Sequence, residues 1–235
     1  MSLEEFLDHT RKKTNADLER FNYLASHDLK EPIRNIGNFT GLIFKKLPAQ
    51  ARKELGDYFS IIKNSSKHLY DLLDDLVKYN QIRHFNPVFQ EVDMKALISD
   101  VWISLEEVVQ QNNAKLNVDT LPAINSSQSL LYILFYNLIE NGLKYNTSED
   151  PVIRIIYTKQ SGMHEFRIID NGQGIDEAYH KTVFQVFRKL ENRRETPGSG
   201  IGLAICKTIV QKLKGKIELE SQLNQGSTFI VELPE

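Results

Sequence analysis

The stretch NLIENGLKY, residues Asn137–Tyr145, lies within an otherwise apolar helical pattern and decides how the sequence is interpreted. At about 100° per residue of α-helix, Asn137, Asn141 and Lys144 fall within about 60° of one another. One side of the expected helix therefore offers two amide groups and an ammonium group, which suit Mg²⁺ and phosphate respectively. The alternative is an ordinary solvated face. Asparagine is a poor helix former, however, and two of them spaced by four residues weaken that alternative.

Two glycine-rich clusters follow this stretch: Asp170-Asn171-Gly172-Gln173-Gly174 and Gly198-Ser199-Gly200-Ile201-Gly202. The first comes directly after an apolar run. It could be a plain hairpin turn, but its second glycine would let a flat ligand approach closely. Asp170 would then lie at a strand end, where a carboxylate can accept a hydrogen bond from an exocyclic amine. The second cluster leads into a helical segment, and the amide groups exposed at a helix start favour phosphate. Each cluster is a weak signal alone, whereas the three motifs in this order favour a nucleotide site.

Other phosphate-binding motifs do not match. No glycine is followed by lysine and then a hydroxyl residue, as the Walker pattern requires. A dinucleotide-binding fold places its glycines after the first strand of a βαβ unit, whereas here they come late, behind the basic residues Arg188, Lys189, Arg193 and Arg194. The His-Arg-Asp loop of the protein kinases is absent from the sequence.

The sequence pattern of the first third of the chain indicates helices. Apolar residues recur at helical spacing from Leu3 to Ile82, with a break near Leu47-Pro48-Ala49. After the break they step by three, four or seven residues, which is typical of a narrow seam between packed helices: Leu55, Phe59, Ile62, Leu69, Leu73 and Leu76. Two long antiparallel helices have no globular core of their own. We therefore expect a second copy to complete a four-helix bundle in a homodimer.

From Asn86 onward, short β-like runs alternate with helical segments, which predicts an α/β sandwich. The expected strands are Val152–Tyr157, Glu165–Asp170, Lys216–Glu220 and Thr228–Leu233. The expected helices are Met94–Gln111, Ser129–Tyr145 and Ile201–Leu213. The apolar pattern changes near His84–Pro87. This change predicts two domains, a helical hairpin over residues 1–85 and an α/β domain over residues 86–235.

Composition narrows the possible functions. The 235 residues carry a net charge of −2. The overall charge therefore does not favour binding to nucleic acid or to an anionic membrane. The single cysteine, Cys206, cannot form an internal disulfide, which indicates a reducing compartment. No apolar run approaches the roughly 20 residues that cross a bilayer, and the chain does not start with a secretion signal. We expect a cytoplasmic chain that is a fragment of a longer protein, because the helical pattern is already under way at its start.

His27 differs from the other histidines, which we expect on the surface. It lies in Ser26-His27-Asp28-Leu29-Lys30-Glu31-Pro32 and points away from the apolar seam. Pro32 removes one helix hydrogen bond and should bend the helix within a turn of His27. A neutral imidazole, with a pKa near about 6.5, can act as a nucleophile at neutral pH. Asp28 is the adjacent acid, while Glu31 at i+4 is better placed by geometry, and either could receive the imidazole proton.

Taken together, these residues resemble the sensor histidine kinases of two-component systems, most closely the phytochrome-like and PAS-linked members. The similarity runs from about Thr14 to the end of the chain. His27–Pro32 resembles the H box, Asn137–Tyr145 the N box and Asp170–Gly174 the G1 box. Phe184-Gln185-Val186-Phe187 resembles the F box, and Gly198–Gly202 resembles the G2 box. The resemblance implies a dimeric phosphoacceptor hairpin followed by an ATP-binding α/β domain of the gyrase and histidine kinase type.

The resemblance also implies roles for individual residues. His27 would be the phosphoacceptor and Asp28 its acidic neighbour. Asn141 and Asn137 would coordinate Mg²⁺. The implied nucleotide contacts are Lys144, Tyr145, Asp170, Gly172, Gly174, Lys189, Gly198, Ser199, Gly200 and Gly202, with Asp170 reading adenine and Lys189 the nearest match for a γ-phosphate contact. The phosphoryl group would pass from ATP to His27 and then to an aspartate in the receiver domain of a response regulator.

Two rival functions remain. Gyrase and the heat-shock and mismatch-repair ATPases share the ATP fold and hydrolyse ATP with a glutamate one turn before the metal-binding asparagine. Here Asn137 occupies that position and cannot serve as a base, which disfavours hydrolysis. The other rival is a scaffold dimer with an inactive ATP domain, and the intact set of Asn141, Lys144, Asp170 and glycines argues against it.

Overall fold

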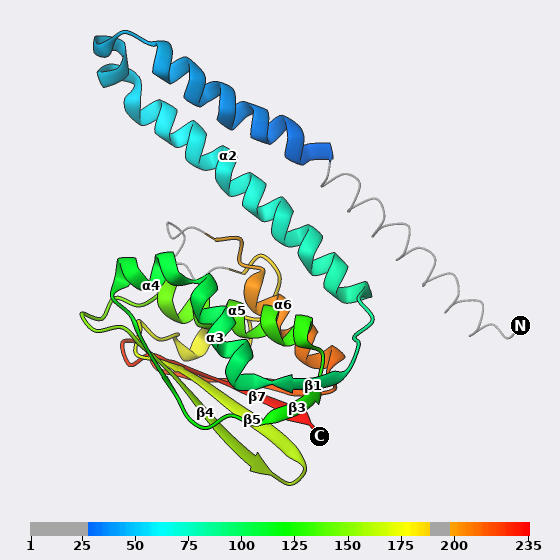
Figure 1. The fold of residues 1–235 in the computed structure, drawn as a ribbon. Coiled ribbons are helices and arrows are strands. Elements are labelled where there is room, and N and C mark those ends of the chain that lie inside the picture. Colours follow the sequence, from blue (N-terminus) through cyan, green and yellow to red (C-terminus); the bar gives the residue numbers. More distant parts are fainter. Residues whose placement is uncertain (1–27, 189–197) are drawn as a thin grey trace, which may run out of the picture. The chain divides into compact units, whose positions relative to one another are not determined.

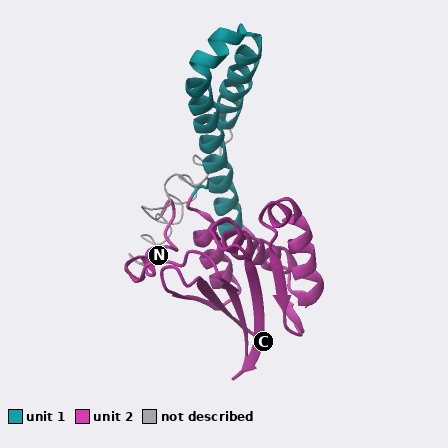
Figure 2. Cartoon of the chain, turned by 90° about the vertical axis from the view of Figure 1, so that its left-hand side faces the viewer, with its two compact units in different colours: residues 1–84, 193–199 teal, residues 85–192, 200–235 magenta. Residues whose placement is uncertain are grey.

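The computed structural model describes residues 28–188 and 198–235. The chain divides into two compact units, residues 1–84 with 193–199 and residues 85–192 with 200–235 (Figure 2). Within the described ranges, no helix is both long enough and apolar enough to span a bilayer.

The first unit contains a helical hairpin. Residues 28–46 are helical, and after a short break at Leu47 and Pro48 the long helix α2 runs over Ala49–His84 (Figure 1). Three contacts show that the two helices are antiparallel. Lys30 pairs with Asp74 at 2.7 Å, Gly37 lies opposite Ser66, and the rings of Phe44 and Phe59 are 5.1 Å apart.

Many apolar side chains of this hairpin are exposed in the single chain. Nine of them have at least 45% of their surface exposed: Leu29, Ile36, Phe39, Leu42, Ile43, Tyr58, Ile61, Ile62 and Leu69. Exposed apolar surface of this extent along a pair of helices indicates an interaction face. The described helices thus form a two-helix hairpin with an uncovered apolar face.

The second unit is an α/β sandwich. Its main sheet has the order β2-β4-β5-β7-β6, built from Lys115–Val118, Val152–Gln160, Met163–Asp170, Ser227–Pro234 and Lys216–Ser221. β2 is parallel to β4, and the other neighbours are antiparallel. A separate two-stranded sheet pairs β1 (Gln90–Asp93) with β3 (Ala123–Ser126). The helices lie on one side of the main sheet (Figure 1): α3 (Met94–Ser104), α4 (Glu106–Asn112), α5 (Gln128–Lys144) and α6 (Gly202–Lys212).

The core lies between α5 and the sheet. Along β5, His164, Phe166 and Ile168 are buried and alternate with more exposed residues, as expected for a strand covered on one face. α5 buries eight residues, and the ring of its Phe135 meets Phe166 edge-on, with 5.5 Å between the ring centres. Cys206 of α6 is fully buried, and this burial raises the pKa of its thiol.

Two sequence-based expectations were wrong in detail. The helix expected over Met94–Gln111 is broken at Leu105, whose backbone N–H bonds to Trp102 three residues back while its side chain is buried. The interruption divides the segment into α3 and α4. The short strands β1, β2 and β3 were not expected, because four residues are too few to show an alternating pattern.

His164 was expected on the surface but is only 7% exposed. Its Nδ1 lies 3.0 Å from the Tyr157 hydroxyl. Burial, and secondarily the charge of Lys159, lower the pKa of His164 from its usual value. The folded chain thus takes up the His164 proton at a lower pH than the unfolded chain, whose pKa is near about 6.5.

We therefore expect the free energy of unfolding to be highest above pH about 6.5 and to fall as the pH drops below that value. Urea unfolding between pH 5 and pH 8 measures this dependence. His164→Gln should flatten the slope near pH 6, whereas His84→Gln, at the exposed end of α2, should leave it unchanged. Equal slopes for wild type and His164→Gln would contradict this assignment.

Candidate functional site

The predicted polar side of α5 is only partly covered. Asn137, Asn141 and Lys144 are each half-buried, while residues on the other side of the helix, such as Leu134 and Leu138, are buried. The Nζ of Lys144 lies 5.2 Å from the centre of the Tyr145 ring, so the helix ends with a cation next to an aromatic face. The side chain of Asn141 makes no hydrogen bond to any other described residue, and its amide is thus available to a ligand.

Asn137 positions the start of α6. Its Nδ2 donates to the carbonyl of Ile133 at 2.7 Å, and its Oδ1 faces Gly202, the first residue of α6. A Cβ atom on Gly202 would lie only 2.8 Å from that oxygen. The absence of a side chain at position 202 therefore lets the amide-rich start of α6 approach the asparagine face of α5. A helix start with exposed amide groups attracts anions.

Asp170 stands at the end of β5 and organises the turn that follows. Its Oδ1 accepts hydrogen bonds from the backbone N–H groups of Gly172 at 2.9 Å and Ser227 at 3.2 Å. α5 comes close to this carboxylate at Gly142, where a Cβ atom would lie 3.2 Å from the Asp170 Cβ. Backbone donors thus fix the acid between the end of the sheet and α5.

The turn after Asp170 is tied to two other segments. The N–H of Gln173 donates to the carbonyl of Tyr145 at 3.2 Å, and the carbonyl of Gln173 accepts from the N–H of Asn224 at 2.7 Å. Gly174 adopts a positive φ of 67°, and its α-carbon faces the backbone of Gln222 so closely that no Cβ fits. The turn is therefore rigidly held between the end of α5 and the β6–β7 hairpin.

Asn171 secures the loop that follows α5. Its Oδ1 accepts from Asn146 and from the backbone N–H of Val152, and its Nδ2 donates to the carbonyl of Asp150 at 2.9 Å. Asn171, Asn146, Gly142 and Ser227 were not singled out from the sequence. Gly142 and Asn171 lie within motifs that the sequence shows, and Gly142 is further marked as a glycine inside a helix.

The remaining predicted residues are distributed as follows. Gly200 has a φ of 74° and lies against the backbone of Arg188, whose guanidinium is 5.9 Å from the ring centre of Tyr179. Gly198 and Ser199 fall in the first unit and are not part of the cluster in the second. Lys189 and His27 lie outside the described residues. Asp28 and Glu31 are described, in the first unit, and both are exposed.

Within the second unit, the structure thus brings together three of the predicted elements: the asparagine face of α5, the Asp170–Gly174 turn and the start of α6. The described residues contain no group of three or more His, Cys, Asp and Glu side chains arranged to hold a metal ion. Mg²⁺ usually keeps waters and binds through one or two protein oxygens together with substrate phosphates. The amide oxygens of Asn141 and Asn137 fit that kind of site.

The comparisons with known proteins agree with this arrangement. The family described as histidine kinase-, DNA gyrase B- and HSP90-like ATPase matches residues 126–235. The phytochrome-like protein Cph1 of Synechocystis is 31% identical over 95% of this chain, and cyanobacterial phytochrome A of Nostoc is 31% identical over 97%. The chain spans only 30% of the length of each of these two relatives.

Solved structures show the same fold. A crystal structure of full-length ShkA in complex with AMPPNP has a TM-score of 0.69 to this chain, with 21% identity. It covers 92% of this chain, which spans 45% of ShkA. The mycobacterial sensor histidine kinase MprB has a TM-score of 0.53 and is 27% identical; it covers 63% of this chain, which spans 97% of that structure. Residues 126–235 therefore belong to the histidine kinase-, DNA gyrase B- and HSP90-like ATPase family, and over nearly its whole length the chain is similar to the corresponding region of these phytochrome-like proteins.

Proposed function

We propose that this chain transfers the γ-phosphoryl group of ATP to its own His27 and then to an aspartate in the receiver domain of a response regulator. In this proposal residues 86–235 form the ATP-binding domain, and residues 1–85 form the hairpin that carries His27 and makes the homodimer. The exposed apolar residues of the hairpin support the dimer, because a second copy of the same face would bury them.

The observation that carries this proposal is the meeting of α5, the Asp170 turn and the start of α6 within one unit. A site for ATP needs an acceptor for the adenine amine, donors for the phosphates and oxygen ligands for Mg²⁺. Asp170 supplies the acceptor, and the amides that begin α6 at Gly202 supply donors beside Asn137. Gly172 and Gly174 allow the close backbone approaches that hold the turn after Asp170 in place, and Tyr145 and Lys144 lie at the end of α5.

The transfer itself makes few covalent demands on the protein. The bond between the γ-phosphorus and its bridging oxygen breaks, a bond from phosphorus to a ring nitrogen of His27 forms, and ADP leaves. The ring proton passes to Asp28 or Glu31, both of which are open to solvent. Mg²⁺ bound through Asn141 and Asn137 supplies charge neutralisation for the phosphates. Lys144, Lys189 and the segment containing Gly198, Ser199 and Gly200 are further phosphate contacts in this proposal.

Hydrolysis of ATP without a protein acceptor is the rival. It needs a base one turn before Asn141, and the residue there is Asn137, whose Nδ2 is already committed to the Ile133 carbonyl. An amide takes up no proton at neutral pH, so this arrangement does not activate water.

An inactive scaffold is the other alternative. The free amide of Asn141 and the fixed carboxylate of Asp170 favour a working nucleotide site over it.

Asn141→Ala tests the nucleotide site directly. We expect it to weaken Mg²⁺-dependent ATP binding by about tenfold or more, equivalent to roughly 1.4 kcal/mol, because a metal ligand is removed. Calorimetric titration with ATP in the presence of Mg²⁺ and in the presence of a chelator separates the metal-dependent part. Asn117→Ala, an exposed asparagine on β2, is the matched control. An unchanged affinity in Asn141→Ala would remove this residue from the site.

A further inference from the structure

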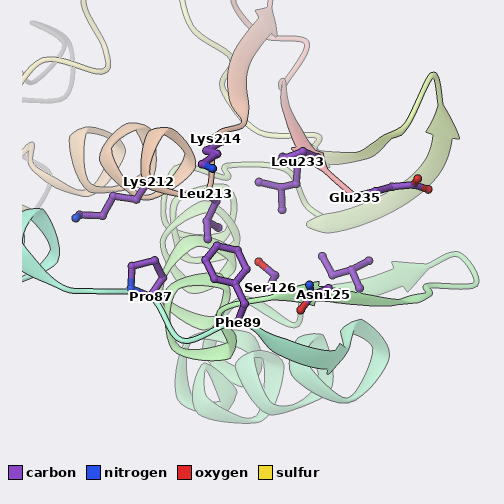
Figure 3. A pocket seen from close by; sticks show the side chains of 11 residues that line it. Pro87, Phe89, Asn125, Ser126, Lys212, Leu213, Lys214, Leu233 and Glu235 are labelled. Carbon is purple, nitrogen blue, oxygen red and sulfur yellow. The ribbon is translucent and has the colours of Figure 1, made fainter.

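The second unit contains a cavity of about 340 Å³ that none of the proposed nucleotide-site residues lines. Its walls come from the segment after α2, from β3, from the end of α6 and from the end of β7 (Figure 3). This volume is at the lower end of the range of about 300–1,000 Å³ found for small-molecule sites, so the cavity suits a compact ligand.

The apolar part of this cavity combines buried leucines with an exposed aromatic ring. Leu213 and Leu233 are 3% and 2% exposed, so they form fixed walls. Phe89 is 49% exposed and Pro87 precedes it on the same wall. An exposed aromatic ring opposite buried leucines is a surface on which a flat ring can stack while losing contact with water.

A serine hydroxyl opens into the cavity. Ser126 is only 4% exposed, and its hydroxyl makes no hydrogen bond to any other described residue. Figure 3 shows its oxygen directed into this space beside the Phe89 ring. This hydroxyl can therefore donate a hydrogen bond to an acceptor on a ligand that enters the cavity.

Two lysines, Lys212 and Lys214, line the cavity. Lys212 donates one hydrogen bond from Nζ to the carbonyl of Phe85 at 3.1 Å, which leaves the other N–H groups of the ammonium available. Lys214, at the other side of the cavity, has no partner among the described residues. Glu235 also lines the cavity, and its side-chain carboxylate is paired with Lys159.

We propose that this cavity binds a small amphipathic anion that has an aromatic ring and a carboxylate. The ring lies between Phe89 and the walls formed by Leu213 and Leu233. The carboxylate accepts from the hydroxyl of Ser126 and from the ammonium groups of Lys212 and Lys214. The site is independent of the proposed nucleotide site, although α6 connects the two: its first residue, Gly202, faces Asn137, and Lys212, its last, borders this cavity.

The test uses the whole chain and two probes of nearly the same shape, indole-3-acetate and its neutral amide. Calorimetry or ligand-detected NMR should show binding of the acid at concentrations up to about 5 mM, and at least about tenfold weaker binding of the amide, because the amide lacks the charge. Lys214→Gln and Ser126→Ala should each weaken binding of the acid by about fivefold or more. Lys207→Gln, an exposed position on α6 away from the cavity, should leave it unchanged.

Absence of binding by the acid at that concentration would overturn the proposal. So would equal affinity for the acid and the amide, or an equal loss in Lys207→Gln and Lys214→Gln, because either would mean general adsorption. Ser126→Ala changes a single buried atom, and its far-UV circular dichroism should match that of the wild type. Lys214→Gln alters an exposed side chain and gives an independent result even if Ser126→Ala is less stable.

Discussion

Replacing His27 by glutamine should abolish the incorporation of phosphate from ATP into the chain. The substitution keeps a polar side chain of similar length but removes the ring nitrogen whose lone pair attacks the γ-phosphorus. ATP affinity should stay within about twofold of the wild type, because the proposed nucleotide contacts are distant in sequence from residue 27 and changes at independent sites have independent effects. The measurement is protein-bound label after incubation with ATP labelled at the γ position, together with calorimetry for binding.

His68→Gln is the matched control for this substitution. It makes the same change at a half-buried histidine of α2 in the same unit. The control should retain incorporation near the wild-type level. Full labelling of His27→Gln, or equal losses in the two variants, would contradict the assignment of His27 as the acceptor.

Gly174→Ala should destabilise the second unit strongly and weaken ATP binding at the same time. The backbone of Gly174 has a φ of 67°, and a Cβ atom there would overlap the carbonyl oxygen of Gln222, which belongs to rigid backbone. The left-handed conformation and the overlap together should cost roughly 2–5 kcal/mol. The substitution would shift this turn, and the turn fixes Asp170 through the N–H of Gly172. ATP binding should therefore weaken as well.

Gly162→Ala separates these two costs. Gly162 also has a positive φ, 75°, but a Cβ atom there would meet nothing within 4 Å. The Gly162→Ala variant should therefore lose only the free energy of unfolding that comes from the left-handed conformation, about 1–2 kcal/mol, and its ATP affinity should stay unchanged. Urea unfolding measures both variants, and nucleotide titration under folding conditions measures the second effect. Equal destabilisation by the two substitutions would show that the close approach to Gln222 is not important.

The sequence predicted the parts of the fold that rest on long periodic segments. The apolar face of α5 and the alternation along β5 are each visible over many residues, and the structure has both elements within a few residues of the expected bounds. The hairpin helices were predicted for the same reason. The sequence did not predict β1, β2 and β3, which have four residues each and are stabilised by pairing with distant segments.

The break at Leu105 was missed because the apolar pattern continues through it, and only its backbone geometry departs from a helix. The burial of His164 was missed for a related reason. A histidine alternating with Phe166 and Ile168 has the position of a core residue, but its polarity favoured the surface.

For the candidate site, glycines and asparagines with unusual spacing were sufficient to indicate α5, the Asp170 turn and the start of α6. Their mutual approach depends on contacts that no local pattern encodes. Asn137 lies against Gly202, 65 residues later in the chain, and the Asp170 carboxylate accepts from Ser227, 57 residues later. Ser227 has no distinguishing sequence context, so its role could not be predicted.

The most direct test of the account is to identify the side chain that carries phosphate after the unmodified chain is incubated with Mg²⁺ and ATP. Peptide mapping at neutral or alkaline pH preserves phosphohistidine, and treatment with acid should remove the label. The account predicts a single acid-labile, base-stable phosphate on His27. Inorganic phosphate released into solution with no phosphate on the chain, or a stable phosphate on a serine, threonine or tyrosine, would contradict it.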